Sequence, residues 1–174
     1  PVLIDQEGGR VQRLGPPHWR AAPPAAAFGK LYEPDDDTAF DAARLNARLI
    51  AEELRDLGVD VDCAPVLDVP VAGAHDVIGD RAFSDDPEVV AEVGRAFCEG
   101  LLDGGVLPVI KHMPGHGRAT ADSHESLPVI AADPEEMLES DFVPFVDHGD
   151  MPWGMTAHVV YKALDEKLPA TLSA

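Results

Sequence analysis

The spacing of apolar residues predicts two long helices. Residues 35–58 begin with aspartates, end at Gly58 and carry apolar side chains every three or four positions. These apolar positions are Phe40, Ala43, Ala47, Ile50, Leu54 and Leu57. Residues 84–105 repeat the pattern and end in glycines, and residues 84–86 have the composition of a helix cap in front of Pro87.

A third helix is predicted over residues 133–149. Asp133 opens it, Glu136 is placed for a capping box, and Pro144 must kink or end it because proline lacks a backbone N–H. Residues 6–34 are rich in glycine and proline, which predicts a long loop instead of a regular element.

Four short apolar runs predict strands between these helices. They read "VLID", "VDVDCAPVLDV", "VLPVIKH" and "WGMTAHVVY", at residues 2–5, 59–69, 106–112 and 153–161. The second is expected to be a short strand that runs into a loop. The run at residues 106–112 is almost wholly apolar until its last two residues, as expected for a strand covered on both faces. Strand, loop, helix and strand follow one another three times, which is typical of parallel βα units in an α/β fold.

Polar residues gather where these strands end. Asp5, Asp68, Lys111 with His112, and His158 each lie at or just after the carboxyl end of a predicted strand. In α/β barrels the active site lies at that end, because the βα loops converge there. Four strands cannot close an eight-stranded barrel, so the chain is either an open sheet or about half of a barrel.

Composition narrows the class of protein further. A chain of 174 residues with 45% hydrophobic content is expected to form one globular domain. The formal net charge of −19 argues against nucleic acid or an anionic membrane as a partner. With no apolar run of roughly 20 residues and no charged-then-apolar leader, a cytoplasmic location is expected. Cys63 and Cys98 are expected to be buried free thiols.

The segment "KHMPGHGRATADSH", residues 111–124, carries most of the candidate chemistry. Its residue types suit either a metal site or the transfer of a proton to a substrate. If it holds a metal, the protein would be a metal-dependent barrel hydrolase, which is one of the functions considered. Its possible ligands are His112, His116, Asp122 and His124. Their spacing does not match a structural zinc motif and Lys111 would repel a cation, so no metal site is expected. Loss of activity on dialysis against a chelator would establish one.

Five segments, in order, resemble motifs of bacterial β-N-acetylhexosaminidases of glycoside hydrolase family three, of the peptidoglycan-recycling type. They read "IDQEGGRVQRL", "APVLDV", "VIGDRAFSDDP", "KHMPGHGRATADSH" and "AHVVY". The resemblance implies a (β/α)8 TIM-type barrel that needs no cofactor and removes terminal β-linked N-acetylglucosamine from muropeptides with retention of configuration. The implied sugar-binding residues are Asp5, Arg13, Arg81, Lys111 and His112.

The resemblance makes His124 the acid/base, positioned by Asp122. Histidine changes its charge at roughly pH 6.5, so it can protonate a leaving oxygen and later deprotonate water. On an extended loop, side chains two residues apart point the same way, which lets Asp122 fix the imidazole. The family's nucleophile is an aspartate on a later strand that these 174 residues do not include. Residues 1–174 are therefore expected to be a partial barrel domain without its first strand or strands and its C-terminal strands.

Several alternatives remain open from the sequence alone. Arg13 and Arg81 could pair with acidic neighbours instead of sugar, and Asp68 could either orient the site or cap a loop. An incomplete barrel could also bind sugar without turnover, and transfer to phosphate could replace hydrolysis. His148 is expected to be a plain surface or loop residue. The oligomeric state is not predicted.

Overall fold

The computed structural model describes residues 1–34 and 36–173, and its centre is a parallel sheet. Four strands pair in the order β1-β4-β5-β7, all parallel, which confirms the predicted parallel βα organisation. They are β1 (Leu3–Ile4), β4 (Val61–Asp62), β5 (Leu107–Met113) and β7 (Trp153–Thr156). Leu3 lies opposite Val61, and Val61 lies opposite Leu107.

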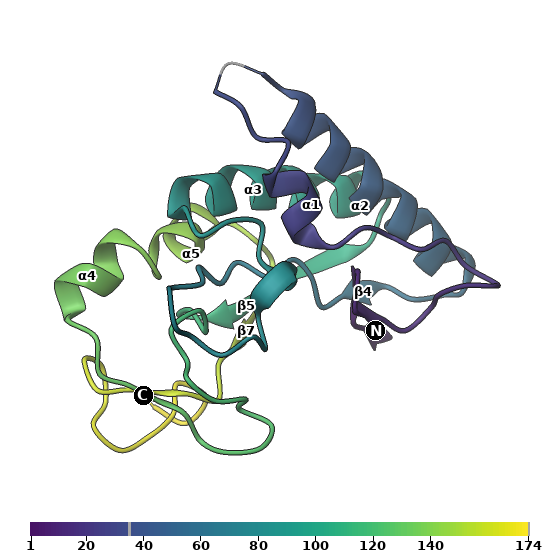
Figure 1. Ribbon diagram of the computed structural model, residues 1–174. Helices are drawn as coiled ribbons and strands as arrows, with labels where there is room; N and C mark the ends of the chain where they lie inside the picture. Colours follow the sequence, from purple (N-terminus) through teal and green to yellow (C-terminus); the bar gives the residue numbers. More distant parts are fainter. Residues whose placement is uncertain (35, 174) are drawn as a thin grey trace.

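Two long helices lie side by side along one side of this sheet (Figure 1). They are α2 (Thr38–Asp56) and α3 (Pro87–Asp103), as the apolar spacing predicts. Glycines on α3 allow the close approach, because a Cβ at Gly100 would lie 2.2 Å from the carbonyl oxygen of Arg44. Leu57, predicted on the apolar face, is 51% exposed because α2 ends one residue earlier.

Residues 84–86 form the predicted cap of α3. The carboxylate of Asp86 accepts a hydrogen bond from the backbone N–H of Glu88 at 2.9 Å, and Pro87 occupies the first turn. Proline is tolerated there because that N–H has no partner within the helix.

The predicted helix over residues 133–149 is two short helices instead, α4 (Pro134–Glu139) and α5 (Val143–Asp147). The chain breaks ahead of Pro144, which then lies in the first turn of α5. The predicted capping box is also wrong: Glu136 pairs with Arg118 at 2.6 Å instead of reaching back to the N-cap.

Two further predictions need correction. Residues 6–34 contain an antiparallel hairpin of β2 (Gln6–Gly8) and β3 (Val11–Gln12), and a short helix α1 (Ala25–Gly29). The single strand predicted over residues 153–161 divides into β7 and β8. The second piece leaves the main sheet and pairs with another strand: β8 (Val160–Tyr161) is parallel to β6 (Val129–Ile130). A 3-10 turn, η1, spans Gly79–Arg81.

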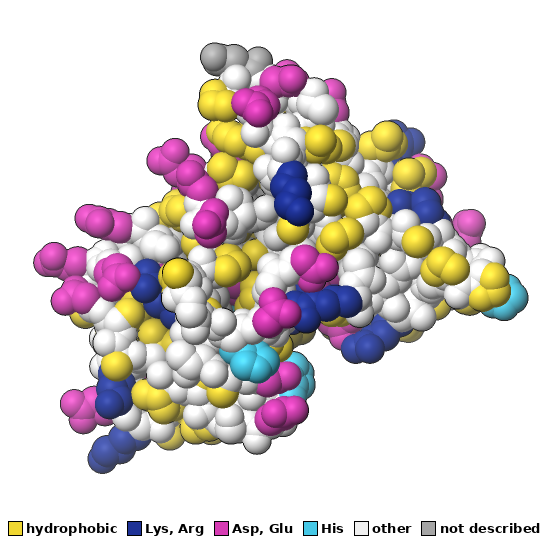
Figure 2. Space-filling model, in the orientation of Figure 1, with side chains coloured by type: hydrophobic (Ala, Val, Ile, Leu, Met, Phe, Trp, Pro, Cys, Tyr) yellow, Lys and Arg dark blue, Asp and Glu magenta, His cyan; other side chains and the backbone are white. Residues whose placement is uncertain are grey.

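The main core lies between the helices and the sheet. Cys63 and Cys98 are buried and free, as predicted. His148 lies in the turn after α5, in keeping with the expected loop position, but it is buried at 1% exposure instead of lying at the surface; its Nδ1 lies 2.6 Å from the carbonyl oxygen of Pro144. Acidic side chains are scattered over the face shown in Figure 2. Among residues 1–34 and 36–173, no helix is long and apolar enough to cross a membrane.

Candidate functional site

A cavity of about 280 Å³ lies at the carboxyl end of the sheet. It brings together six of the seven residues predicted from the sequence. These are Asp5, Arg13, Arg81, Lys111, His112 and His124. The seventh, Asp122, does not line the cavity, but its Oδ1 atom lies 2.7 Å from the Nδ1 atom of His124.

The fold explains why these distant residues meet. Asp5 directly follows β1, and Lys111 and His112 lie near the end of β5. Because parallel strands end at the same edge of a sheet, their final side chains face one cavity. The β2–β3 hairpin turns Arg13 back over Asp5, and η1 supplies Arg81.

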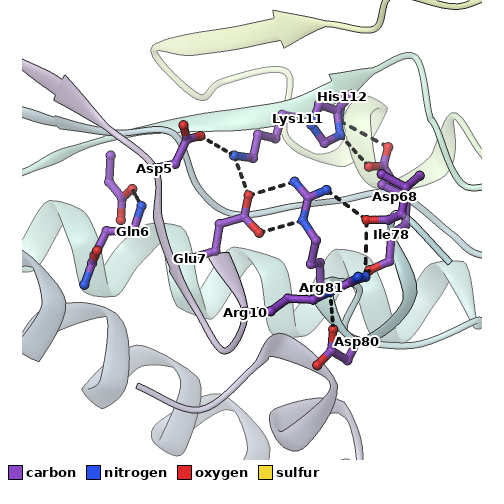
Figure 3. A network of polar contacts seen from close by, with 12 residues as sticks. Asp5, Gln6, Glu7, Arg10, Asp68, Ile78, Asp80, Arg81, Lys111 and His112 are labelled. Carbon is purple, nitrogen blue, oxygen red and sulfur yellow. Dashed lines mark hydrogen bonds and ion pairs between the residues drawn. The ribbon is translucent and has the colours of Figure 1, made fainter. Parts of the chain in front are cut away.

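A buried ion network holds the cations of the site (Figure 3). The Lys111 Nζ atom lies 2.9 Å from Asp5 Oδ1 and 2.5 Å from Glu7 Oε1. Arg81 donates from Nε and Nη2 to the two oxygens of Glu7, each at 2.9 Å. The Lys111 side chain is 2% exposed, so its charge must be balanced by these carboxylates. Arg81 is thus ion-paired and also lines the cavity.

Asp5 remains an ionised acceptor within this network. Burial alone would raise its pKa, but Lys111, followed by Arg13 and Arg81, holds the pKa below its ordinary value. Arg13 is the loosest member, because its side chain is 66% exposed and Nη2 lies 3.7 Å from Asp5 Oδ2. An ionised carboxylate beside several N–H donors is a suitable group for gripping the hydroxyls of a sugar.

His124 is fixed by its neighbour although it is exposed. Asp122 Oδ1 accepts the backbone N–H of His124 at 2.9 Å and lies 2.7 Å from His124 Nδ1. The hydrogen bonds from His124 lower the pKa of Asp122, so the carboxylate is ionised and Nδ1 carries a proton. The other ring nitrogen, Nε2, is then free to exchange a proton with a ligand in the cavity.

The base of the loop that carries this pair is anchored. Tyr161 donates its hydroxyl hydrogen to the carbonyl oxygen of Gly115 at 2.7 Å, and Arg118 donates from Nε to Asp141 at 2.6 Å. His116 is 4% exposed and its backbone N–H donates to Asp68, which fixes this part of the loop. His124, with an 82% exposed side chain, lies beyond this anchored base.

The ligand set of the metal-dependent alternative is not assembled. Within the described part of the chain, no group of three or more histidines, cysteines or acidic residues lies close enough to hold a metal ion. His112 and His116 do lie together, with ring centroids 5.7 Å apart, but His124 pairs with Asp122 instead.

Sequence reasoning missed Glu7, the carboxylate that joins Arg81 to Lys111. The region was predicted to be a loop, in which side-chain direction cannot be inferred. The signal was present nonetheless: Glu7 follows Asp5 by two residues in an extended segment, so the two side chains point to the same side.

Asp62 is a second acidic residue that the sequence did not single out. It is fully buried in β4, where Oδ1 accepts the backbone N–H of Gln6 at 3.0 Å and Oδ2 has no partner among the described residues. Burial raises the pKa of Asp62 from its ordinary value near 3.8 to about 7.

Replacing Asp62 by asparagine should make stability less sensitive to pH. Because the folded-state pKa is raised, the stabilisation from this group is complete at low pH and is lost as the pH rises through about 7. From pH 5 to pH 8, wild type should lose about 2–3 kcal/mol relative to Asp62→Asn. Urea unfolding at both pH values measures this. The exposed Asp56→Asn serves as control, and parallel pH curves for wild type and Asp62→Asn would contradict the prediction.

Comparison with known proteins shows extensive similarity. The family described as "Glycosyl hydrolase family 3 N terminal domain" matches residues 1–174. A beta-hexosaminidase from Xanthomonas campestris is 44% identical over 165 residues, which cover 92% of this chain and 48% of that protein. The crystal structure of NagZ from Neisseria gonorrhoeae in complex with N-trifluoroacetyl-D-glucosamine gives a TM-score of 0.88 at 38% identity, covering 95% of this chain and 49% of that one.

A third relative extends the structural comparison. The glycoside hydrolase family 3 β-N-acetylglucosaminidase from Paenibacillus gives a TM-score of 0.90 at 36% identity, covering 98% of this chain and 32% of that one. The similarity and the parallel sheet together show a TIM-barrel-like α/β fold. The chain spans about half the length of the beta-hexosaminidase and of NagZ.

Proposed function

The chain belongs to the glycosyl hydrolase family 3 N-terminal domain family, and from that premise we propose that it forms about half of a (β/α)8 barrel that removes terminal β-linked N-acetylglucosamine. The observation that carries this proposal is the convergence of Asp5, Lys111, His112 and His124 on one cavity, with His124 paired to Asp122. The remaining strands would come from outside residues 1–174 and would bring a nucleophilic carboxylate.

In this proposal the ion network binds the sugar. Asp5 accepts hydrogen bonds from hydroxyls, while Lys111, Arg13 and Arg81 donate to sugar oxygens. Because Glu7 already fixes Lys111 and Arg81, these donors lose little conformational freedom when the sugar arrives. A site of this kind recognises one terminal pyranose, and the N-acetylglucosamine analogue bound to NagZ supports a sugar of that class.

The same proposal assigns proton transfer to His124. In the first step the nucleophile bonds to the anomeric carbon, the glycosidic bond breaks, and His124 Nε2 gives its proton to the leaving oxygen. In the second step water attacks the anomeric carbon, the sugar–carboxylate bond breaks, and Nε2 takes the proton from water. Asp122 stays ionised throughout and stabilises the imidazolium from the Nδ1 side.

The natural substrate in this proposal is a peptidoglycan-derived muropeptide in the cytoplasm. Transfer to phosphate in place of water is tested by running the reaction in phosphate buffer. Release of free N-acetylglucosamine supports hydrolysis, whereas release of the sugar-1-phosphate indicates phosphorolysis. Sugar binding without either product would support a sugar-binding pseudoenzyme.

Replacing Asp5 by alanine should abolish detectable N-acetylglucosamine binding. The sugar loses a charged acceptor, and Lys111 and Arg13 lose a counter-charge. Loss of one charged hydrogen bond costs about 1.5–3 kcal/mol, or at least a tenfold loss of affinity. Calorimetry should use the completed barrel, meaning this chain joined to the segments of a relative that it does not cover. The exposed Asp56→Ala at the end of α2 is the control; unchanged affinity in a folded Asp5→Ala protein would rule out the assignment.

A further inference from the structure

Asp68 is a fully buried carboxylate whose hydrogen bonds all lead to the end of β5 and the loop that follows it. Its Oδ1 accepts two backbone N–H groups, from His112 at 3.2 Å and from His116 at 2.6 Å. Its Oδ2 lies 2.6 Å from the Nδ1 atom of His112. The side chain has no exposed surface, so it cannot touch a ligand itself. It therefore caps the loop, as one reading of the sequence suggests, and also holds an imidazole.

The charge of Asp68 decides which nitrogen of His112 carries a proton. Burial alone would raise the pKa of Asp68, but His112 and the hydrogen bonds from His112 and His116 bring it below its ordinary value. An ionised carboxylate only accepts, so His112 Nδ1 must donate to it. The Nε2 atom lies on the far side of the ring from Asp68, and His112 lines the cavity.

We propose that Asp68 is a positioning residue that keeps His112 in the tautomer presenting an unprotonated Nε2 as an acceptor to the sugar. The reason is that the side chains around the cavity offer more hydrogen-bond donors than acceptors. Lys111, Arg13 and Arg81 offer only N–H donors, whereas each sugar hydroxyl also has a hydrogen to donate. Asp5 accepts some of these, and His112 Nε2 adds a second acceptor. The role toward sugar rests on the proposed function, whereas the tautomer does not.

Asp68→Asn tests the tautomer directly, because asparagine has nearly the same shape. Its amide oxygen can accept the two backbone N–H groups in place of Oδ1, which leaves its NH₂ group facing His112 Nδ1. An NH₂ group donates, so Nδ1 must become the acceptor and the proton must move to Nε2. In the completed barrel, long-range ¹H–¹⁵N spectra of the histidine rings, at a pH where they are neutral, should show an Nδ1–H tautomer in wild type and Nε2–H in Asp68→Asn.

The signal of His112 is identified by its absence from His112→Gln. The matched control is Asp62→Asn, which alters another fully buried aspartate; it accepts a hydrogen bond from Gln6 and forms none with a histidine among the described residues. It should leave the His112 tautomer unchanged. An Nε2–H tautomer in wild type would overturn the proposal even if Asp68→Asn failed to fold. So would an Nδ1–H tautomer that persists in a folded Asp68→Asn protein.

Sugar affinity supplies a second readout. Asp68→Asn should weaken N-acetylglucosamine binding about tenfold by removing the acceptor, but should add little further loss in a His112→Ala background. Equal losses in both backgrounds would mean that Asp68 acts only on the general shape of the site, which contradicts the proposal. If wild type binds no N-acetylglucosamine at all, the proposed function fails, and the tautomer measurement still decides whether Asp68 positions His112.

Discussion

Replacing His124 by alanine should lower the rate of cleavage of an alkyl β-N-acetylglucosaminide about 10² to 10⁴-fold in the completed barrel. Among the described residues that line the cavity, His124 is the one whose imidazole pairs with a carboxylate on its own loop, Asp122. Without the imidazole, the leaving oxygen must depart unprotonated. For a nitrophenyl substrate the leaving group needs no proton, so the loss in the first step should be much smaller.

The comparison of the two leaving groups separates acid catalysis from a general loss of structure. A variant that is merely unfolded or unable to bind loses both substrates equally, and equal losses would contradict the acid role of His124. His18→Ala, which removes an exposed histidine that does not line the cavity, should react with both substrates at the wild-type rate. The ratio of the two rates, measured on matched preparations, is therefore the decisive quantity.

The sequence predicted the helices and the parallel sheet because their signals are local. α2 and α3 have uninterrupted helical spacing with clear ends, and residues 107–113 form a long apolar strand. The β2–β3 hairpin was missed because Gly8 and Gly9 were read as loop residues. They adopt positive φ values of 95° and 55°, which allow the tight turn.

In the candidate site, too, residues with a local sequence signal were predicted, and residues defined by long-range contacts were not. The ordered motifs led to Asp5, Lys111 and His124, since each has a recognisable sequence context, and the family resemblance is confirmed. Glu7 stood within one of these motifs but gained its importance from contacts with Arg81 and Lys111, which are 74 and 104 residues away in sequence. A local sequence pattern does not indicate contacts between residues that are so far apart in the chain. The role of Asp68, as a loop cap or as an orienting group, was open for the same reason, and the geometry shows contacts of both kinds.

The 174-residue chain, expressed alone, should not turn over a β-N-acetylglucosaminide. The four-stranded sheet has β1 and β7 at its edges, and Val2, Leu3 and Trp153 near those edges are 56%, 48% and 39% exposed. Apolar residues beside unpaired strand edges favour association with other chains. The isolated chain should therefore aggregate, which size-exclusion chromatography measures against the completed barrel.

We expect the isolated chain to be inactive because of the carboxylates that line the cavity. A retaining mechanism needs a nucleophile roughly 5 Å from the acid/base group. Among the described residues that line the cavity, Asp5 is the one carboxylate, and it is already paired with Lys111 at 2.9 Å. Adding the segments of a relative that this chain does not cover should restore both solubility and release of N-acetylglucosamine. If the purified chain, verified by intact mass, released the sugar catalytically by itself, the nucleophile would have to lie within residues 1–174, and the proposed division of the site between two halves of a barrel would be wrong.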